Sequence, residues 1–198
     1  MRDLRGVLAA LTVVISAALS AEPAAAAGPR YGHVYLLTGL ANVFSVGMDT
    51  LGEELTARGV PNTVRNHLLA HLNVDQIVAD YHGGKINQPI AIIGHSFGGD
   101  AAVWLAEQLN AAHVPVRLLV VFDATAAVRV PANVSEAINF YLSPGGTGVP
   151  LQGGPGFRGV IRNRNLSGTP DIIHTNIDKS AALHKTVIAE VLRTLRRG

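Results

Sequence analysis

Residues 90–99, IAIIGHSFGG, place a serine directly after an apolar run, with a glycine two positions before it and another two positions after it. An alanine-rich segment with helical character follows over residues 97–113. A serine at a tight strand-to-helix turn needs small neighbours, because the strand and the helix approach each other closely there. The N–H groups at the helix N-terminus also favour negative charge nearby. We therefore predict that Ser96 is a nucleophile; an ordinary turn in which Ser96 caps the helix is the alternative.

A serine hydroxyl is a weak nucleophile at neutral pH, so it needs a general base, and the base needs an orienting acid. Asp123 ends the next strand-like run, VRLLVVFDAT at residues 116–125. Because parallel strands end at the same edge of a sheet, we expect its carboxylate to lie near Ser96. Asp123 is the predicted acid, with Asp171 as the second choice. The alternative role for Asp123 is that of a turn or cap residue.

Two of the eight histidines follow Asp123 in the chain. His174 lies in a loop before the final predicted helix, whereas His184 lies inside that helix, where we expect a surface or interface position. His174 is therefore the predicted general base. His95 is adjacent to Ser96 in sequence, but neighbouring residues of a strand point to opposite faces. We expect His95 to pack beneath the serine turn rather than to act as the base.

The sequence resembles the α/β-hydrolase superfamily, particularly its small lipase-like and thioesterase-like members. The residues that carry this resemblance are IAIIGHSFGG, the earlier LLTGL turn, Asp123 after a strand and the late histidine. The resemblance covers essentially all of residues 28–198. The resemblance implies a nucleophile elbow at Ser96 and a triad in the chain order serine, acid, histidine. It also implies acyl transfer without a metal or other cofactor.

Backbone N–H groups form the oxyanion hole in this superfamily. By position, one donor is Phe97, which follows the nucleophile. The second should come from the loop TGLAN, in which Leu40 is the best match and Ala41 the next. Thr38 stands where the family's turn carries histidine, and a plain glycine turn before a helix would look the same.

The elements that must position these residues alternate between strand and helix along the chain. Such alternation, with continuous apolar strands such as IAII and LLVVF, predicts an α/β fold. We expect a mostly parallel sheet of about six strands with helices on both faces and no large cap domain. A glycine- and proline-rich stretch, residues 143–159, is interpreted as a long surface loop beside the site. The predicted strands are 33–40, 60–67, 89–96, 116–125, 138–143 and 157–168, and the predicted helices are 47–59, 73–84, 97–113 and 179–197.

Residues 1–27 have the layout of a secretory signal peptide: a charged start, an apolar run of about 14 residues and a stretch of small residues. A membrane anchor or a buried helix is the alternative, although a span takes about 20 apolar residues. We expect cleavage near Ala26 or Ala27, a single domain over residues 28–198, and a secreted or periplasmic protein. No stable membrane span is then expected.

Net charge and cysteine content exclude several classes of function. The 198-residue chain has a formal net charge of +2 and no cysteine, so neither a nucleic-acid partner nor thiolate chemistry is expected. His67 and His71 are four positions apart, but no helix signal covers both, so we expect no metal site.

Three hypotheses for function remain open. The first is an exported serine hydrolase, esterase- or lipase-like, that cleaves carboxylic esters of small molecules or lipids through Ser96, His174 and Asp123. The second is a thioesterase or acyltransferase with the same triad. The third is a non-catalytic binding module on the hydrolase fold. The residues alone do not separate the first two, because both form an acyl-enzyme.

Overall fold

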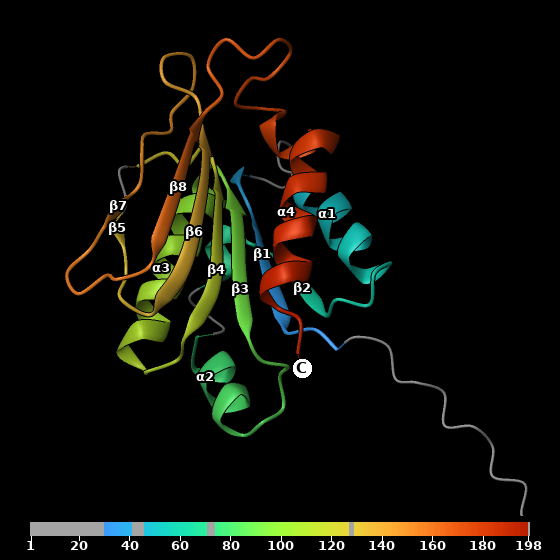
Figure 1. Ribbon diagram of the computed structural model, residues 1–198, viewed down its shortest axis with the longest axis vertical. Helices are drawn as coiled ribbons and strands as arrows, with labels where there is room; N and C mark the ends of the chain where they lie inside the picture. The colour runs from blue at the N-terminus through green and yellow to red at the C-terminus, as the bar shows by residue number, and fades with distance from the viewer. Residues whose placement is uncertain (1–29, 41–45, 71–73, 127–128, 198) are drawn as a thin grey trace, which may run out of the picture.

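The computed structural model describes residues 30–40, 46–70, 74–126 and 129–197. Its centre is a six-stranded sheet in the order β2-β1-β3-β4-β6-β8, in which every neighbouring pair is parallel (Figure 1). The predicted α/β class and six-stranded sheet are thereby confirmed. The strands are β1 (His33–Thr38), β2 (Asn62–Asn66), β3 (Ile90–His95), β4 (Val116–Phe122), β6 (Val134–Tyr141) and β8 (Val160–Asn165).

Within the described residues, four α-helices cover the two faces of this sheet. One face packs against α1 (Val46–Thr56) and α4 (Ala181–Thr194), and the other against α2 (Val74–His82) and α3 (Phe97–Ala111) (Figure 1). Strand β3 shows why its apolar run is continuous. Ile93 packs with the α1 and α4 side while Ile92 packs with the α3 side, and both are fully buried.

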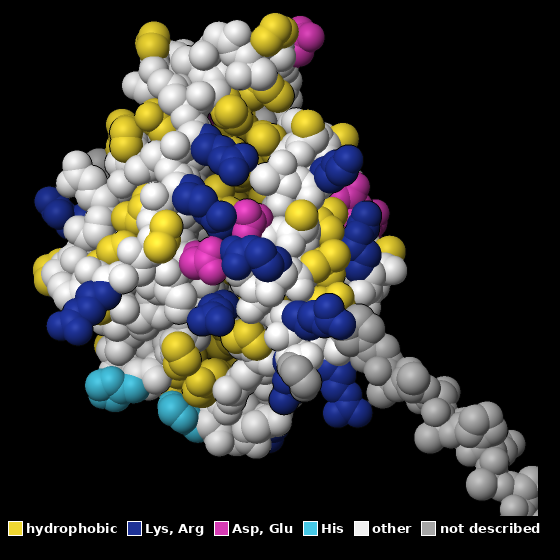
Figure 2. Space-filling view, viewed as in Figure 1, with side chains coloured by type: hydrophobic (Ala, Val, Ile, Leu, Met, Phe, Trp, Pro, Cys, Tyr) yellow, Lys and Arg dark blue, Asp and Glu magenta, His cyan; other side chains and the backbone are white. Residues whose placement is uncertain are grey.

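The segment that carries His174 runs between β8 and α4. A network of ion pairs ties these two elements together, and Figure 2 shows its acidic side chains enclosed by basic ones. Arg162 of β8 pairs with Glu136 of β6 and with Glu190 of α4, at 3.1 Å in each case. Arg193 of α4 pairs with the same two carboxylates, at 2.6 and 2.7 Å. The network therefore joins the two elements at the ends of the His174 segment.

Some elements differ from the sequence prediction. β6 begins at Val134 rather than at residue 138. The stretch 143–159 is not simply a surface loop, because its β7 (Gln152–Gly153) pairs with β5 (Arg129–Val130). Two short 3₁₀ helices, η2 (His67–Leu69) and η4 (Ile177–Lys179), were also not expected. The pairing of β5 with β7 joins Arg129 and Gln152, which are far apart in the sequence, so no local pattern reveals it.

The predicted signal peptide, residues 1–27, lies outside the described residues, as do Ala41 and His71. In the part of the chain that the structure describes, every helix is too short or too polar to cross a membrane.

Candidate active site

Ser96 lies in the turn between β3 and α3, with φ of 57° and ψ of −127°. Positive φ costs a non-glycine residue about 1–2 kcal/mol, so the surrounding structure must hold it there. Its N–H donates to the Phe122 carbonyl of β4 at 2.9 Å. The flanking glycines allow the turn: a Cβ on Gly94 would lie 2.8 Å from the Gly99 nitrogen, and one on Gly98 would lie 2.9 Å from the Thr38 carbonyl carbon.

Ser96, His174 and Asp123 form one hydrogen-bonded chain. Ser96 Oγ lies 3.0 Å from His174 Nε2, and His174 Nδ1 lies 2.6 Å from Asp123 Oδ2. Because a carboxylate only accepts, Nδ1 donates the proton, and the neutral ring then has Nε2 ready to accept from the serine hydroxyl. Asp123 is fully buried and Ser96 nearly so, whereas the His174 side chain is 27% exposed. The structure thus brings together the three residues that the sequence predicted.

The Asp123 carboxylate is held by backbone donors as well as by His174. Oδ1 accepts from the N–H groups of Leu142 at 2.9 Å and Gly148 at 2.8 Å, and Oδ2 accepts from Thr147 N–H at 3.2 Å. Burial alone would raise the pKa of Asp123, but the hydrogen bonds from His174 and these three groups outweigh burial and lower the pKa. Asp123 is therefore ionised at neutral pH and can hold an imidazolium.

The sequence did not reveal that residues 144–148 form a loop around the Asp123 carboxylate. A Cβ on Gly146 or Gly148 would collide with the Asp123 carboxylate, so both positions need glycine. The Thr147 hydroxyl donates to the carbonyls of Asp123 and Ala124, at 3.2 Å each. The glycine spacing in SPGGTG indicates a tight loop, but nothing in the sequence indicates which group it surrounds.

The two predicted oxyanion donors come from adjoining segments. Phe97 is the first residue of α3, where a helix has no acceptor of its own for the N–H group. Leu40 follows β1, which pairs directly with β3. The end of β1 packs so closely on the first turn of α3 that a side chain at Gly98 would strike the Leu37 carbonyl. The role of these N–H groups stays a prediction.

Asp100, Asp171 and His184 lie outside the hydrogen-bonded chain of Ser96, His174 and Asp123. Asp100 accepts from the N–H groups of Thr125 at 3.3 Å and Ala126 at 3.0 Å and from the Thr125 hydroxyl, so it caps the turn after β4. Asp171, the second choice for the acid, is exposed in a turn with φ of 62°. His184 is buried rather than on the surface.

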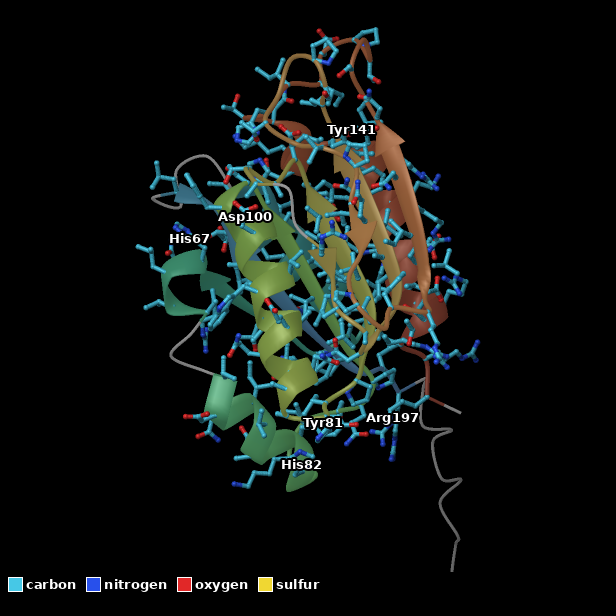
Figure 3. The ribbon with its side chains drawn as sticks, turned by 90° about the vertical axis from the view of Figure 1, so that its left-hand side faces the viewer. His67, Tyr81, His82, Asp100, Tyr141 and Arg197 are labelled. Carbon is cyan, nitrogen blue, oxygen red and sulfur yellow. The ribbon has the colours of Figure 1, made fainter. Side chains whose placement is uncertain are left out.

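Exposed apolar side chains lie next to Ser96 and His174 in the sequence, on the segment after β1 and on η2. Phe97 follows the nucleophile, and its ring stacks on His67 with centroids 5.6 Å apart. His67 Nδ1 lies 3.1 Å from the Gly39 carbonyl, which joins η2 to the end of β1. Figure 3 shows His67 beside the N-terminal end of α3. We call the following five residues the apolar rim: Leu40, Leu68, Leu69, Phe97 and Ile173, all of them 43% exposed or more.

A shallow groove of about 350 Å³ continues from His67 along α3. Its walls are His67, Ala70, Asp100, Ala101 and Trp104. In the described ranges, no three metal-ligating side chains gather into a possible metal site.

No protein-family model and no curated protein sequence matches the chain. Solved structures do match it. YbtT, a type II thioesterase from the yersiniabactin NRPS/PKS biosynthetic pathway, superimposes with a TM-score of 0.53 at 10% identity, covering 84% of this chain and 93% of its own. BorB, the type II thioesterase from the borrelidin biosynthetic cluster, has a TM-score of 0.52 at 15% identity, covering 85% and 95%. Human thioesterase 2 superimposes with a TM-score of 0.50 at 13% sequence identity, covering 82% of this chain and 95% of its own.

At these identities the likeness concerns the fold. The parallel sheet order, the helices on both faces and these neighbours show that the chain has the α/β-hydrolase fold, as the sequence predicted.

Proposed function

We propose that this chain is a serine hydrolase that cleaves acyl thioesters or esters through an acyl-enzyme on Ser96. The observation that carries the proposal is the continuous hydrogen-bonded chain from Ser96 Oγ through His174 to the buried Asp123 carboxylate. A serine, a base that accepts from it and an acid that orients the base are the parts that nucleophilic acyl transfer needs.

In the proposed reaction, Ser96 Oγ attacks the acyl carbonyl while His174 Nε2 takes the hydroxyl proton. The imidazolium then gives this proton to the leaving thiol or alcohol, and the acyl group stays on Ser96. Water attacks the acyl-enzyme in the same way, with His174 again as the base, and releases the carboxylic acid. The Asp123 carboxylate stabilises the imidazolium in both steps. The N–H groups of Phe97 and Leu40 are the proposed donors to the oxyanion.

The same triad can cleave an ester or a thioester, so the residues of the triad do not decide which acyl bond is the substrate. Sequence reasoning put ester cleavage first and thioester cleavage second. The three solved structures described above are named as thioesterases, which favours the second reading. The apolar rim supports an acyl group that is itself apolar, since such a group would bury part of this exposed surface.

Export is a separate part of the proposal and depends on residues 1–27. Expression of the full chain followed by cell fractionation and N-terminal sequencing tests it. We expect the protein outside the cytoplasm, beginning near residue 27 or 28. Recovery of the uncleaved chain in the cytoplasm would remove export from the proposal and leave the chemistry intact.

The chemistry is tested with a fluorophosphonate probe and a pair of substrates that share one acyl chain. Wild type should be labelled, Ser96→Ala should not, and the thioester should show a higher kcat/KM than the matched oxoester. A preference for the oxoester would return the proposal to an esterase. Absence of both labelling and turnover in the folded wild type would instead favour a non-catalytic binding module.

A further inference from the structure

The residue before the nucleophile also contacts the general base. His95 is the last residue of β3 and is fully buried. Its Nε2 lies 2.8 Å from the backbone carbonyl oxygen of His174. Because a carbonyl oxygen only accepts, His95 Nε2 must carry the proton and donate it. Burial lowers the pKa of His95 to about 4, although the hydrogen bond to His174 opposes this, so the ring is neutral at physiological pH.

This hydrogen bond connects the backbone around His174 to a residue far away in the sequence. Among the described residues, the other hydrogen bonds that hold the backbone of 171–176 are local. Ile173 N–H donates to Asn176 Oδ1 at 2.9 Å, and Asn176 Nδ2 donates to the Asp171 carbonyl at 2.9 Å. These bonds shape the segment but do not place it against the sheet. His95 does so, from the end of a strand that lies in the middle of the sheet.

Asp178 lies on the other side of the His95 ring. Its Oδ2 is 3.7 Å from His95 Nδ1 and accepts from the Gly47 N–H of α1 at 3.1 Å. The Asp178 carbonyl accepts from His184 Nε2 at 2.6 Å, and His184 Nδ1 lies 3.2 Å from Glu54 Oε2. Asp178 is therefore fixed between α1 and α4, and it is fully buried. The His95 ring lies between this carboxylate and the His174 carbonyl.

Consecutive residues thus determine both ends of the Ser96–His174 hydrogen bond. Ser96 supplies the hydroxyl, and His95 fixes the backbone from which the imidazole extends. We infer that His95 is a positioning residue that holds the general base in line with the nucleophile. This inference rests on the proposed function, in which His174 is the base.

Two substitutions at His95 separate its hydrogen bond from its bulk. His95→Leu removes the donor, and His95→Gln keeps an N–H at a similar reach. A misplacement of about 1 Å at a reacting group can cost about 100-fold in rate. We expect kcat of His95→Leu to fall about 10- to 100-fold with KM within about twofold, and His95→Gln to recover most of the loss. Ile93→Val, on the same strand, is the control for a small loss of stability and should leave kcat unchanged.

A double-mutant cycle shows whether His95 acts through His174. In a His174→Ala background no base remains to be positioned, so adding His95→Leu should change the residual rate by less than about twofold. An equal loss in both backgrounds would mean a general structural role and would overturn the inference. So would a His95→Leu variant with wild-type kcat, or a His95→Gln variant as slow as His95→Leu.

A readout without substrate keeps this test distinct from a failure of the proposed function. The proton NMR signal of His174 Nδ1–H, hydrogen-bonded to Asp123, reports the position of the ring whether or not the chain turns over an acyl substrate. We expect this signal to broaden or disappear in His95→Leu and to persist in His95→Gln and Ile93→Val. An unchanged signal in His95→Leu contradicts the positioning role. A wild type with the signal but without fluorophosphonate labelling would contradict the proposed function instead.

Discussion

Asp123→Asn replaces one carboxylate oxygen by an amide nitrogen and tests the tautomer of His174. Asparagine tolerates the left-handed backbone that Asp123 adopts, with φ of 44°, so the turn after β4 should persist. The amide oxygen should take the place of Oδ1, because Leu142 and Gly148 both donate there. The amide NH₂ group then faces His174 Nδ1.

Two N–H donors cannot hydrogen-bond to each other, so His174 should move its proton from Nδ1 to Nε2. Nε2 then donates toward Ser96 instead of accepting, and the base is lost. In serine triads this change lowers kcat by about 10⁴-fold, which corresponds to about 5 kcal/mol of transition-state stabilisation. The Thr147 N–H also faces the new NH₂ group, and leaving it unsatisfied should lower stability by about 1–3 kcal/mol.

The assay is kcat on an acyl thioester, together with the rate of fluorophosphonate labelling and the thermal midpoint. Asp171→Asn is the matched control, because Asp171 also has positive φ but is exposed and lies outside the Ser96–His174–Asp123 hydrogen-bonded chain. It should keep wild-type kcat. A folded Asp123→Asn variant with kcat within tenfold of wild type would refute the tautomer reasoning, and a large loss in Asp171→Asn would reassign the acid.

Three further predictions concern the turn, the nucleophile and the buried acid. Ser96→Ala should lower kcat by about 10⁶-fold with an unchanged thermal midpoint, and residual turnover above about 1% would reassign the nucleophile. Gly98→Ala should lower the soluble yield or the free energy of unfolding, because its Cβ strikes the Leu37 carbonyl. The control Ala102→Gly should lower the free energy of unfolding by only about 1 kcal/mol. Equal stability of Gly98→Ala and wild type in denaturant titration would contradict this prediction. Burial raises the pKa of Asp178 from 3.8 to about 6, so the folded state binds more protons than the unfolded state between these values and stability falls as pH rises through them. Relative to Asp178→Asn, the free energy of unfolding of the wild type should fall by about 3 kcal/mol between these two pH values. Parallel curves of unfolding free energy against pH for the two proteins would contradict the raised pKa of Asp178.

Most of the sheet could be predicted because its signals are local. The run IAIIGHS is apolar at every position up to Gly94, which indicates a strand covered on both faces, and β3 is buried throughout. The order of the strands in the sheet could not be predicted, because hydrophobic periodicity shows that a strand is buried but not which strand lies beside it. The pairing of β5 with β7 joins two-residue strands, too short for any periodic pattern.

By itself, the sequence determined which residues could perform the chemistry: Ser96 from its glycine spacing, and Asp123 and His174 from chain order and the edge where parallel strands end. Only the tertiary structure decided how these groups are held. The N–H groups of Thr147 and Gly148 around the carboxylate, and the His95 contact to the His174 carbonyl, join residues 24 to 79 positions apart. Backbone N–H and carbonyl groups are the same at every residue, so a sequence carries no pattern that marks which of them will meet.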